Sequence, residues 1–467
     1  MAAFQFKQRS LPRLGLFTML VLLLFSMLFW RERAWLLDVA FQTFLMIKDG
    51  TVWVMVYRFG AATVQSLPLL AIKLGAPLAW VSWLYSVSFH LHFLLFFCIA
   101  NYWFKREDVG LGIVLLYTAM TYDGFYWQTS ELQQGLGFLL VTWAALLYSP
   151  TPQRRWWYWP AWAIAIIALA FYHPLVFMPF YFMLIWLWFR PKTGIPRWTL
   201  GILGSLMMLV LVIKQVWFQN WYDLQKTSQF KSQLIADFPN YFNYPAYGKF
   251  FTNALQYWWG YSLLFIIICY LLLRKRQYLG VSFLLITLLG FLALTAIGDH
   301  ETPFRFYAEV NYYPLLAFVL VPIIIQGMPM LQKAPQYKFY LVATFFAARL
   351  LLIFLHGQEY TKRIDYIRQL TTTTKQEQQR LTVPNSQLDQ IVLLMDWGLP
   401  YETLLQSATE SNRPITLLPI SSNDFKVAEL EADSLFVTPW DEFPLDEVNA
   451  NPYWHFPSEA YGKFIDN

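Results

Sequence analysis

Charged side chains are scarce in this sequence. They make up 13% of its 467 residues, and apolar residues make up 57%. Soluble domains carry roughly 25% charged residues. The composition therefore excludes an ordinary soluble globular domain and indicates a chain embedded in a lipid bilayer.

Cysteines and nucleotide-binding motifs are also few or missing. Cys98 and Cys269 are the two cysteines, and both lie within apolar runs, so no disulfide framework is indicated. The sequence contains no GxxxxGK[ST], no GxGxxG after a strand, no HExxH and no GxSxG, so chemistry on soluble nucleotides has no support. It also lacks an Asn-x-Ser/Thr sequon, which favours a bacterial plasma membrane over a membrane of the secretory pathway.

The apolar residues form runs of the length that crosses a bilayer. A spanning helix needs about 20 mostly apolar residues, and the connections that carry most Lys and Arg are expected on the cytoplasmic side. The basic connections alternate with acidic ones, which predicts an all-α polytopic domain with its N-terminus inside and its C-terminus outside. The first span has no cleavage site before Arg31, so we expect it to be a retained signal anchor. The eleven predicted spans are 14–30, 76–103, 109–122, 130–148, 156–172, 174–190, 197–216, 252–273, 278–298, 311–328 and 337–356.

The chain changes character after His356. Residues 357–467 hold 8 Lys and Arg against 17 Asp and Glu, whereas the preceding part is basic in its cytoplasmic loops and so requires no nucleic-acid partner. We expect a membrane domain over 1–356 and a small extracytoplasmic α/β domain over 357–467. Its predicted helices are 358–380 and 399–411, and its predicted strands are 390–397, 415–420 and 434–438.

The first outer loop, residues 31–75, is long and amphipathic. Asp38 is followed by Phe41, Phe44 and Leu45 at helical spacing, which predicts a helix lying in the membrane interface with its apolar face on lipid. A second such helix follows. Because ionisable groups near a membrane are costly, Asp38, Asp49 and Arg58 are candidate functional residues. The alternative is a collar that braces the spans.

Three short outer loops add further polar residues. Asp123 lies among aromatic residues able to stack on a sugar, and Glu131 lies eight residues later, where it alternatively serves a helix start capped by Ser130. A histidine at a corner between two spans is a structural residue or a ligand contact. The last of these loops carries an arginine suited to forking onto a phosphate, or alternatively to pairing with an acidic neighbour. The residues concerned are His173 in the second of these short loops, and Asp299, His300, Glu301 and Arg305 in the last.

A longer loop, residues 217–251, is rich in aromatic residues and carries Lys226, Lys231 and Lys249. Aromatic side chains suit glycan stacking, but they also anchor any loop in the interface. The loop is therefore compatible with either role.

The layout resembles the integral-membrane glycosyltransferases of the GT-C superfamily, which use lipid-linked sugar donors. The resemblance rests on the long first loop, the acidic residue just after the first span, the Arg-bearing loop before Asn311-Tyr312-Tyr313-Pro314, and the soluble C-terminal part. It implies Asp38 as catalytic base, Asp123 as a second catalytic carboxylate, and Arg305 with His300 on the donor phosphate. From the outer-loop positions of further polar residues, we expect Asp49, Arg58, Glu131, His173, Asp299 and Glu301 to lie around them or near the acceptor.

The expected function is transfer of a sugar from a polyprenyl-phosphate or pyrophosphate donor to a glycan, lipid or protein acceptor at the outer membrane face. A divalent metal is compatible with the resemblance but not required by the sequence. Family members often carry an Asp-Glu pair after the first span, whereas this chain has Leu37-Asp38-Val39. A related scaffold for envelope assembly that lacks catalysis therefore stays open. A transporter fits less well, because the ionisable residues gather at one face and the two halves do not repeat.

Overall fold

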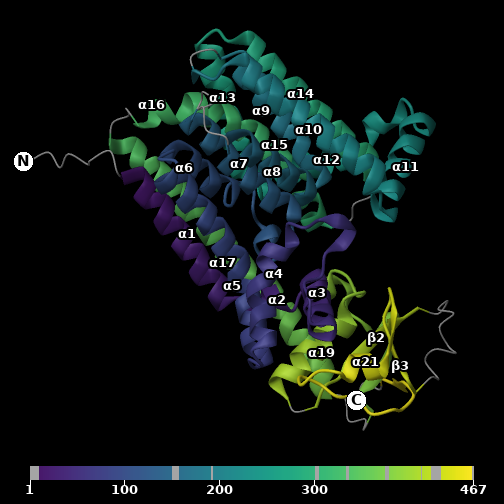
Figure 1. Ribbon diagram of the computed structural model, residues 1–467. Coiled ribbons are helices and arrows are strands. Elements are labelled where there is room, and N and C mark those ends of the chain that lie inside the picture. Colours follow the sequence, from purple (N-terminus) through teal and green to yellow (C-terminus); the bar gives the residue numbers. More distant parts are fainter. Residues whose placement is uncertain are drawn as a thin grey trace, which may run out of the picture.

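The chain forms a helical body with a smaller unit of helices and short strands at one end (Figure 1). The computed structural model describes residues 10–149, 157–190, 193–299, 304–332, 336–373, 378–411, 413–421 and 433–464. His300 and Glu301 lie outside these ranges.

Helices dominate the chain up to Gln332. Their bounds are α1 (Ser10–Leu28), α2 (Trp30–Ala34), α3 (Leu37–Asp49), α4 (Ala61–Lys73), α5 (Leu78–Cys98), α6 (Glu107–Leu116), α7 (Glu131–Tyr148), α8 (Tyr158–Tyr172), α9 (Phe177–Trp188), α10 (Arg197–Trp217), α11 (Trp221–Ala236), α12 (Pro245–Gln256), α13 (Trp259–Arg274), α14 (Tyr278–Gly298), α15 (Arg305–Pro322) and α16 (Met328–Gln332). Short 3-10 or π turns lie at η1 (Met55–Tyr57), η2 (Ile99–Trp103), η3 (Asp123–Phe125), η4 (Pro174–Val176), η6 (Asn240–Asn243), η7 (Ile323–Gly327) and η8 (Asn385–Gln387).

Several of these helices are suited to a membrane. Within the described ranges, six helical stretches are long and apolar enough to cross one, and a seventh is reached if a bent pair counts as one span. Two shorter apolar helices, α8 and α9, accompany them. A multi-pass membrane protein is compatible with this set, while the predicted count of eleven spans and their orientation stay predictions.

Two predicted spans differ from continuous helices. The run 252–273 breaks into α12 and α13, which meet at 90°. The run 109–122 contains only the ten residues of α6, after which residues 117–130 continue as a non-helical, almost wholly buried segment that includes η3. Non-helical backbone at membrane depth is tolerated where protein covers it, and here surrounding side chains bind its polar groups, as described below.

The first loop folds into the two predicted helices, α3 and α4. α3 ends in a left-handed cap at Gly50, with φ 63°, whose N–H donates to Met46 O at 3.0 Å. α4 packs along α5. The helical spacing of the apolar residues in this loop was therefore a sound guide to its local structure.

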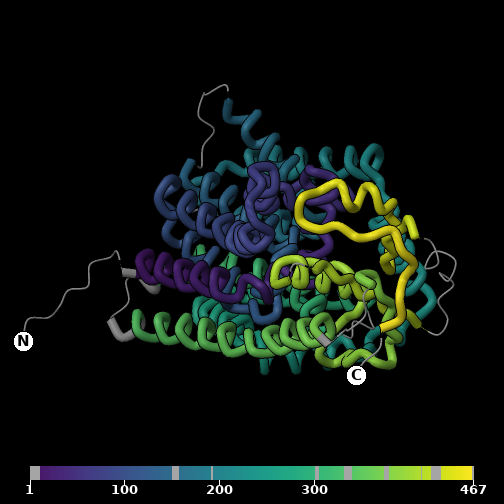
Figure 2. Tube along the Cα trace, turned by 90° about the horizontal axis from the view of Figure 1, so that it is seen from below, coloured from purple at the N-terminus to yellow at the C-terminus, as the bar shows by residue number. Residues whose placement is uncertain are grey.

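The last part of the chain begins with a helix that crosses the predicted domain boundary. α17 (Gln336–Thr373) continues without a break through His356, lies beside α1, and leads into the C-terminal unit, which we define as residues 378–464 (Figures 1 and 2). The elements of the C-terminal unit are β1 (Arg380–Pro384), α18 (Gln390–Leu393), α19 (Leu399–Glu410), β2 (Thr416–Ile420), β3 (Leu435–Val437), β4 (Glu442–Pro444), α21 (Leu445–Asn449) and β5 (Gly462–Lys463).

The strands of the C-terminal unit form two small sheets. β1 lies between β2 and β5 with parallel pairing, in register Leu381 to Leu417 and Leu381 to Gly462, and β3 pairs antiparallel with β4. Residues 390–397, predicted as a strand, form α18 and the segment after it. The reason is local: Asp389 Oδ1 accepts hydrogen bonds from the N–H groups of Ile391 and Val392, which starts a helical turn.

The C-terminal unit shares a hydrophobic core with the first loop. Phe44 of α3 is fully buried and stacks on Phe436 and Trp454, with ring centroids 5.3 and 6.0 Å apart. Phe44 also packs against Tyr401 of α19. The apolar face of α3, expected on lipid, is therefore covered by the C-terminal unit.

Candidate functional site

The buried segment 117–130 is held from two sides. Arg349 of α17 donates from Nε to Thr118 O at 2.9 Å and from Nη2 to Thr121 O at 2.6 Å. Its third nitrogen donates to Tyr257 O at 2.7 Å, at the bend between α12 and α13. One fully buried guanidinium thus satisfies carbonyl groups of two irregular segments.

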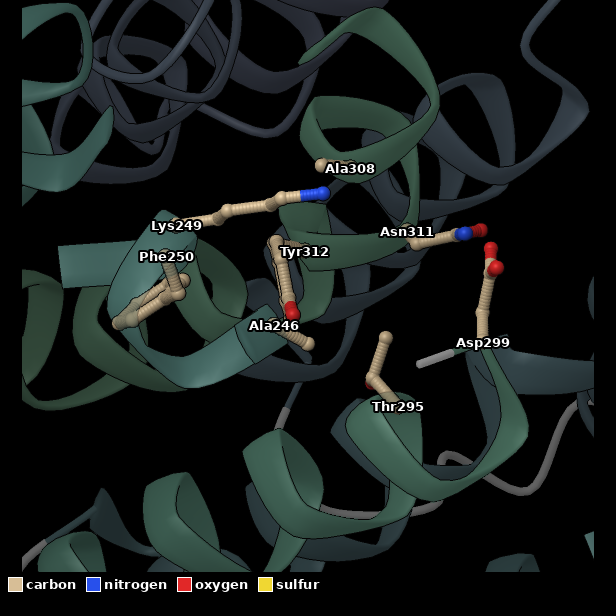
Figure 3. Close-up of a pocket in the computed structure, with 8 residues that line it drawn as sticks. All are labelled: Ala246, Lys249, Phe250, Thr295, Asp299, Ala308, Asn311 and Tyr312. Atoms are coloured by element: carbon tan, nitrogen blue, oxygen red, sulfur yellow. The ribbon is translucent and has the colours of Figure 1, made fainter. Parts of the chain in front are cut away.

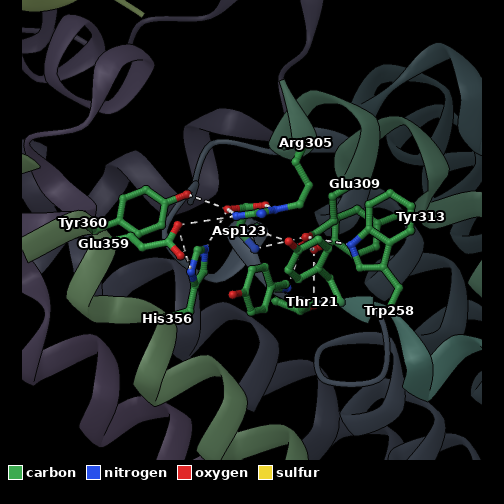
Figure 4. A network of polar contacts seen from close by, with 12 residues as sticks. Thr121, Asp123, Trp258, Arg305, Glu309, Tyr313, His356, Glu359 and Tyr360 are labelled. Carbon is green, nitrogen blue, oxygen red and sulfur yellow. Dashed lines mark hydrogen bonds and ion pairs between the residues drawn. The ribbon is translucent and has the colours of Figure 1, made fainter. Parts of the chain in front are cut away.

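Glu309 of α15 binds backbone N–H groups of the same segment, whereas Arg349 binds its carbonyl groups. Its carboxylate accepts from the backbone N–H groups of Tyr122, Asp123 and Gly124 at 2.8 to 3.0 Å. Trp258 Nε1 and Tyr313 OH donate to it as well, at 3.2 and 3.0 Å (Figure 4). Consecutive N–H groups form a cradle for an acceptor group, and here the cradle holds the carboxyl group of the protein's own Glu309.

Asp123 lies at the centre of a network that joins three elements. Arg305 binds it with both ends of the guanidinium, Nε to Oδ2 at 2.6 Å and Nη2 to Oδ1 at 3.0 Å. His356 Nε2 lies 2.7 Å from Oδ1, and Tyr360 OH donates to Oδ1 at 3.1 Å (Figure 4). The Asp123 network is defined here as Asp123, Arg305, Glu309, His356, Glu359 and Tyr360.

The partners of Asp123 decide its charge. Burial favours the neutral carboxyl, but hydrogen bonds and positive charge from His356 and Arg305 outweigh burial and hold the pKa of Asp123 well below its ordinary value. Asp123 is therefore a fixed anion at neutral pH.

Arg305 makes further contacts with its surroundings. Beyond the two bonds to Asp123, it lies 3.6 Å from a Glu359 carboxylate oxygen, and its guanidinium carbon lies 4.2 Å from the ring centre of Tyr257. The predicted pair of site residues, Asp123 and Arg305, thus meets directly. The alternative role of Arg305, an ion pair that ties two elements together, describes the observed contact.

His356 was not predicted, because it ends an apolar run that indicated only a membrane span. Its ring stacks on Tyr122 with centroids 3.7 Å apart, and its Nδ1 lies 3.5 Å from Glu359. The usable sequence signal was Glu359 and Tyr360, which follow three and four residues later on the same helical face.

A second group, the Arg58 cluster, gathers other predicted residues. Arg58, after η1, lies 3.8 Å from Glu131 at the start of α7 and 3.7 Å from Asp223 of α11. Tyr222 presents its ring to the guanidinium at 5.4 Å. We define the Arg58 cluster as Asp38, Arg58, Glu131, His173, Lys214 and Asp223.

The contacts of Arg58 leave hydrogen-bonding capacity unused. Both ion-pair distances exceed hydrogen-bond length, and Arg58 Nε is buried with no hydrogen-bond partner among the described residues. Its side chain is 13% exposed. Arg58 therefore has a partly buried side chain, and its Nε donor has no acceptor in the described structure.

His173 and Lys214 lie close to Arg58. Burial, together with the positive charges of Arg58 and Lys214, holds the pKa of His173 well below its ordinary value, so His173 is neutral. Its Nδ1 accepts from the backbone N–H of Leu175 at 3.1 Å, which starts η4. The structural role expected of a corner histidine is therefore present, next to two cations.

Glu131 combines two roles. Ser130 caps α7 by accepting from Gln133 N–H at 3.2 Å, which is the alternative that the sequence offered for this loop, and Glu131 lies in the first helical turn. Its carboxylate then faces Arg58.

Asp38 is the second residue of α3 and is partly buried. Among the described residues its side chain makes no hydrogen bond or ion pair, which contrasts with Asp123. Burial, with a smaller contribution from the nearby Glu131 charge, raises the pKa of Asp38 to about 7. Asp38 also lies near Tyr307 of α15. Within the described structure, Asp38 is thus an unpaired carboxyl that titrates near neutral pH.

The remaining predicted residues are more peripheral. Asp49 ends α3, pairs with Lys48 and is 41% exposed in its side chain. Asp299 follows α14 and lines a small hollow with Asn311 and Lys249 (Figure 3). Where the structure is described, no three His, Cys, Asp or Glu side chains gather as a metal site.

Comparisons with known proteins add no family. No family model, curated protein or solved structure matches this chain. The GT-C resemblance stays a prediction, and the Asp123 network and the Arg58 cluster are the structural features from which a function can be inferred.

Proposed function

We propose that this protein is a glycosyltransferase that moves a sugar from a polyprenyl-phosphate or pyrophosphate donor to an acceptor at the outer face of a bacterial plasma membrane. The observation that carries the proposal is Asp38, a carboxyl that is unpaired in the described structure, has a pKa of about 7, and lies at the start of α3, the second helix after the first apolar helix. A general base is most effective when its pKa lies near the working pH.

In this proposal Asp38 removes the proton of an acceptor hydroxyl. The acceptor oxygen then forms a bond to the anomeric carbon, and the bond from that carbon to the donor phosphate breaks. The lipid phosphate leaves with the bonding electrons. Tyr222 and Tyr307 lie beside the Arg58 cluster and Asp38, where their rings suit a sugar face.

Arg58 is better placed than Arg305 to bind the departing phosphate. Arg305 already binds Asp123 with two hydrogen bonds, whereas Arg58 keeps a buried Nε without a partner in the described structure. Guanidinium groups match phosphate geometry and stabilise charge that develops on a leaving group. The proposal therefore assigns the donor phosphate to Arg58, with Lys214 as a second nearby positive charge.

The proposal includes the eleven-span topology with the N-terminus inside and the C-terminal unit outside. Trp440, 62% exposed in the C-terminal unit, is a suitable reporter position. A Trp440→Cys variant with Cys98 and Cys269 replaced by Ala should react with a membrane-impermeant maleimide in intact cells. Reaction only after lysis would reverse the orientation.

The direct test uses the purified full-length protein in lipid. Polyprenyl-phosphate and polyprenyl-pyrophosphate sugars are supplied with cell-envelope acceptors, and the released lipid phosphate and the glycosylated product are measured by mass spectrometry. The matched control is Asp49→Asn, which changes a carboxyl on the same helix that is exposed and paired with Lys48. We expect Asp49→Asn to transfer at the wild-type rate and Asp38→Asn to be strongly impaired.

A non-catalytic scaffold is the second candidate. The observation that favours it is the closed Asp123 network, in which the arginine and carboxylate expected to act on a substrate bind each other. A scaffold predicts no transfer with any donor and no effect of Asp38→Asn on envelope assembly.

A further inference from the structure

The backbone next to Asp38 is bound by a residue of the C-terminal unit. Glu402 of α19 is fully buried, and its Oε1 lies 2.5 Å from the backbone N of Leu37, the residue before Asp38. The first N–H groups of a helix have no partner within the helix. Glu402 therefore caps α3 from 365 residues away.

The backbone at this point needs such support. Leu37 adopts φ 36°, a left-handed conformation that residues with a side chain rarely adopt, and Leu36 provides no side-chain cap for α3. Backbone in such conformations persists when the surrounding structure fixes it. The direction in which α3 starts, and hence the position of the Asp38 carboxyl, depends on what binds Leu37.

Glu402 is itself fixed by Arg363 of α17. Arg363 Nη2 donates to Glu402 Oε1 at 2.9 Å, and Nη1 lies 2.5 Å from Oε2. Both side chains are almost wholly buried. Arg363 also donates from Nε to Leu393 O at 2.9 Å, which connects the pair to α18.

The approach of α19 to Leu37 is close. A Cβ added at Gly398, the residue before α19, would lie 2.9 Å from Leu37 Cα and 3.1 Å from Glu402 Oε1. The C-terminal unit therefore contacts the start of α3 through both backbone and side chain, beside its shared core around Phe44.

We propose that Glu402, held by Arg363, is a positioning residue for Asp38, so that the C-terminal unit completes the site built on the first loop. The inference rests on the proposed function, because it assigns Glu402 to the placement of the catalytic base. It gives the C-terminal unit a role that requires no substrate contact.

The test compares two double variants that differ only in the side chain introduced in place of Glu402. The amide variant, Glu402→Gln with Arg363→Gln, removes the ion pair but keeps an oxygen able to accept from Leu37 N–H. The leucine variant, Glu402→Leu with Arg363→Gln, removes the oxygen and keeps a side chain of similar size. Both double variants are electrically neutral at the two positions, so loss of the ion pair is common to them.

We expect the amide variant to keep kcat within about threefold of wild type. The leucine variant should lose about 10- to 100-fold in kcat with little change in KM for the donor, because a displacement of about 1 Å at a catalytic group has that effect. Hydrogen exchange of the peptide that covers residues 36–46 should speed up in the leucine variant alone. Glu410→Gln, a change on the same helix in an exposed ion pair with Arg368, should alter none of these readouts.

Equal kcat and equal exchange in the two double variants would overturn the positioning role while the proposed function stands. An equal fall in kcat with equal thermal midpoints would also overturn it, because the lost ion pair would then explain the effect. A wild-type protein that transfers no sugar, or an Asp38→Asn variant with wild-type activity, would remove the proposed function and with it the positioning role, whatever the exchange data show.

Discussion

Arg305 and Asp123 bind each other through two hydrogen bonds, 2.6 and 3.0 Å long, across 182 positions of sequence. With His356, they join α15, α17 and the buried segment 117–130. The Asp123 network therefore stabilises the fold. The Arg58 cluster, which includes Asp38, is the group proposed to meet the substrate.

Removal of the Asp123 charge should destabilise the protein. Asp123→Asn leaves Arg305 and His356 with only the more distant and more exposed Glu359 as an anion, and breaking a buried pair from one side costs about 3 kcal/mol. Thermal unfolding in detergent measures the change. Glu410→Gln, which alters an exposed pair with Arg368, should cost under about 1 kcal/mol. Equal losses of unfolding free energy in the two variants would contradict a stabilising role of the Asp123 network.

The same residue predicts how stability depends on pH. Because the folded protein depresses the pKa of Asp123, the unfolded chain takes up its proton first as pH falls. The contribution of Asp123 is therefore complete at neutral pH and is lost below about pH 4, the ordinary range of an aspartate. Unfolding midpoints from pH 7 to 3 should fall more steeply in wild type than in Asp123→Asn. Parallel curves would assign the acid sensitivity to other groups.

Substitutions at the two arginines should separate their roles. Arg58→Lys loses the planar fork expected to bind phosphate, and a hydrogen bond to a charged group contributes about 1.5 to 3 kcal/mol. We therefore expect kcat/KM for the lipid-linked donor to fall by about 10- to 100-fold with little change in the unfolding midpoint. Arg305→Lys should act mainly on stability and lower the unfolding midpoint. If Arg305→Lys lowers kcat/KM and Arg58→Lys lowers the unfolding midpoint, Arg305 and not Arg58 binds the donor phosphate.

The close approach of α13 to the buried segment predicts a sensitive glycine. A Cβ at Gly260 would collide with the backbone of Ala119, whereas one at Gly201 of α10 meets no atom within 4 Å. Gly260→Ala should therefore cost about 1 to 3 kcal/mol, the usual range for overpacking. Gly201→Ala is the matched helical control and should leave the midpoint unchanged or raise it. Thermal unfolding distinguishes the two cases.

Local pattern predicted much of the fold. The apolar runs became α1, α5, α10 and α14, and helical spacing after Asp38 gave α3. The sequence pattern could not show the bend at Tyr257, because the apolar run 252–273 continues through that residue. It also could not show that α17 carries on past His356, since the change in composition there does not interrupt the helix.

The candidate site was predictable only where the residue type itself indicates chemistry. Asp123 and Arg305 stood out as ionisable residues in an apolar chain, and they meet. Glu402 did not stand out, because it lies on an amphipathic helix where an acidic residue is ordinary, and only the fold brings it to Leu37. The unpaired state of Arg58 Nε in the described structure is likewise a property of packing that no spacing reveals.

The most direct measurement is the rate of sugar transfer from a polyprenyl-linked donor by Asp38→Asn beside wild type, over about pH 5.5 to 8.5, a range that brackets the pKa at which a general base works best. The account predicts that the wild-type rate rises with pH through about 7, as Asp38 loses its proton. It also predicts that Asp38→Asn is slower by about 100- to 10,000-fold, the usual contribution of a general base. An Asp38→Asn variant that transfers sugar at the wild-type rate, with the same pH profile, would contradict the central claim.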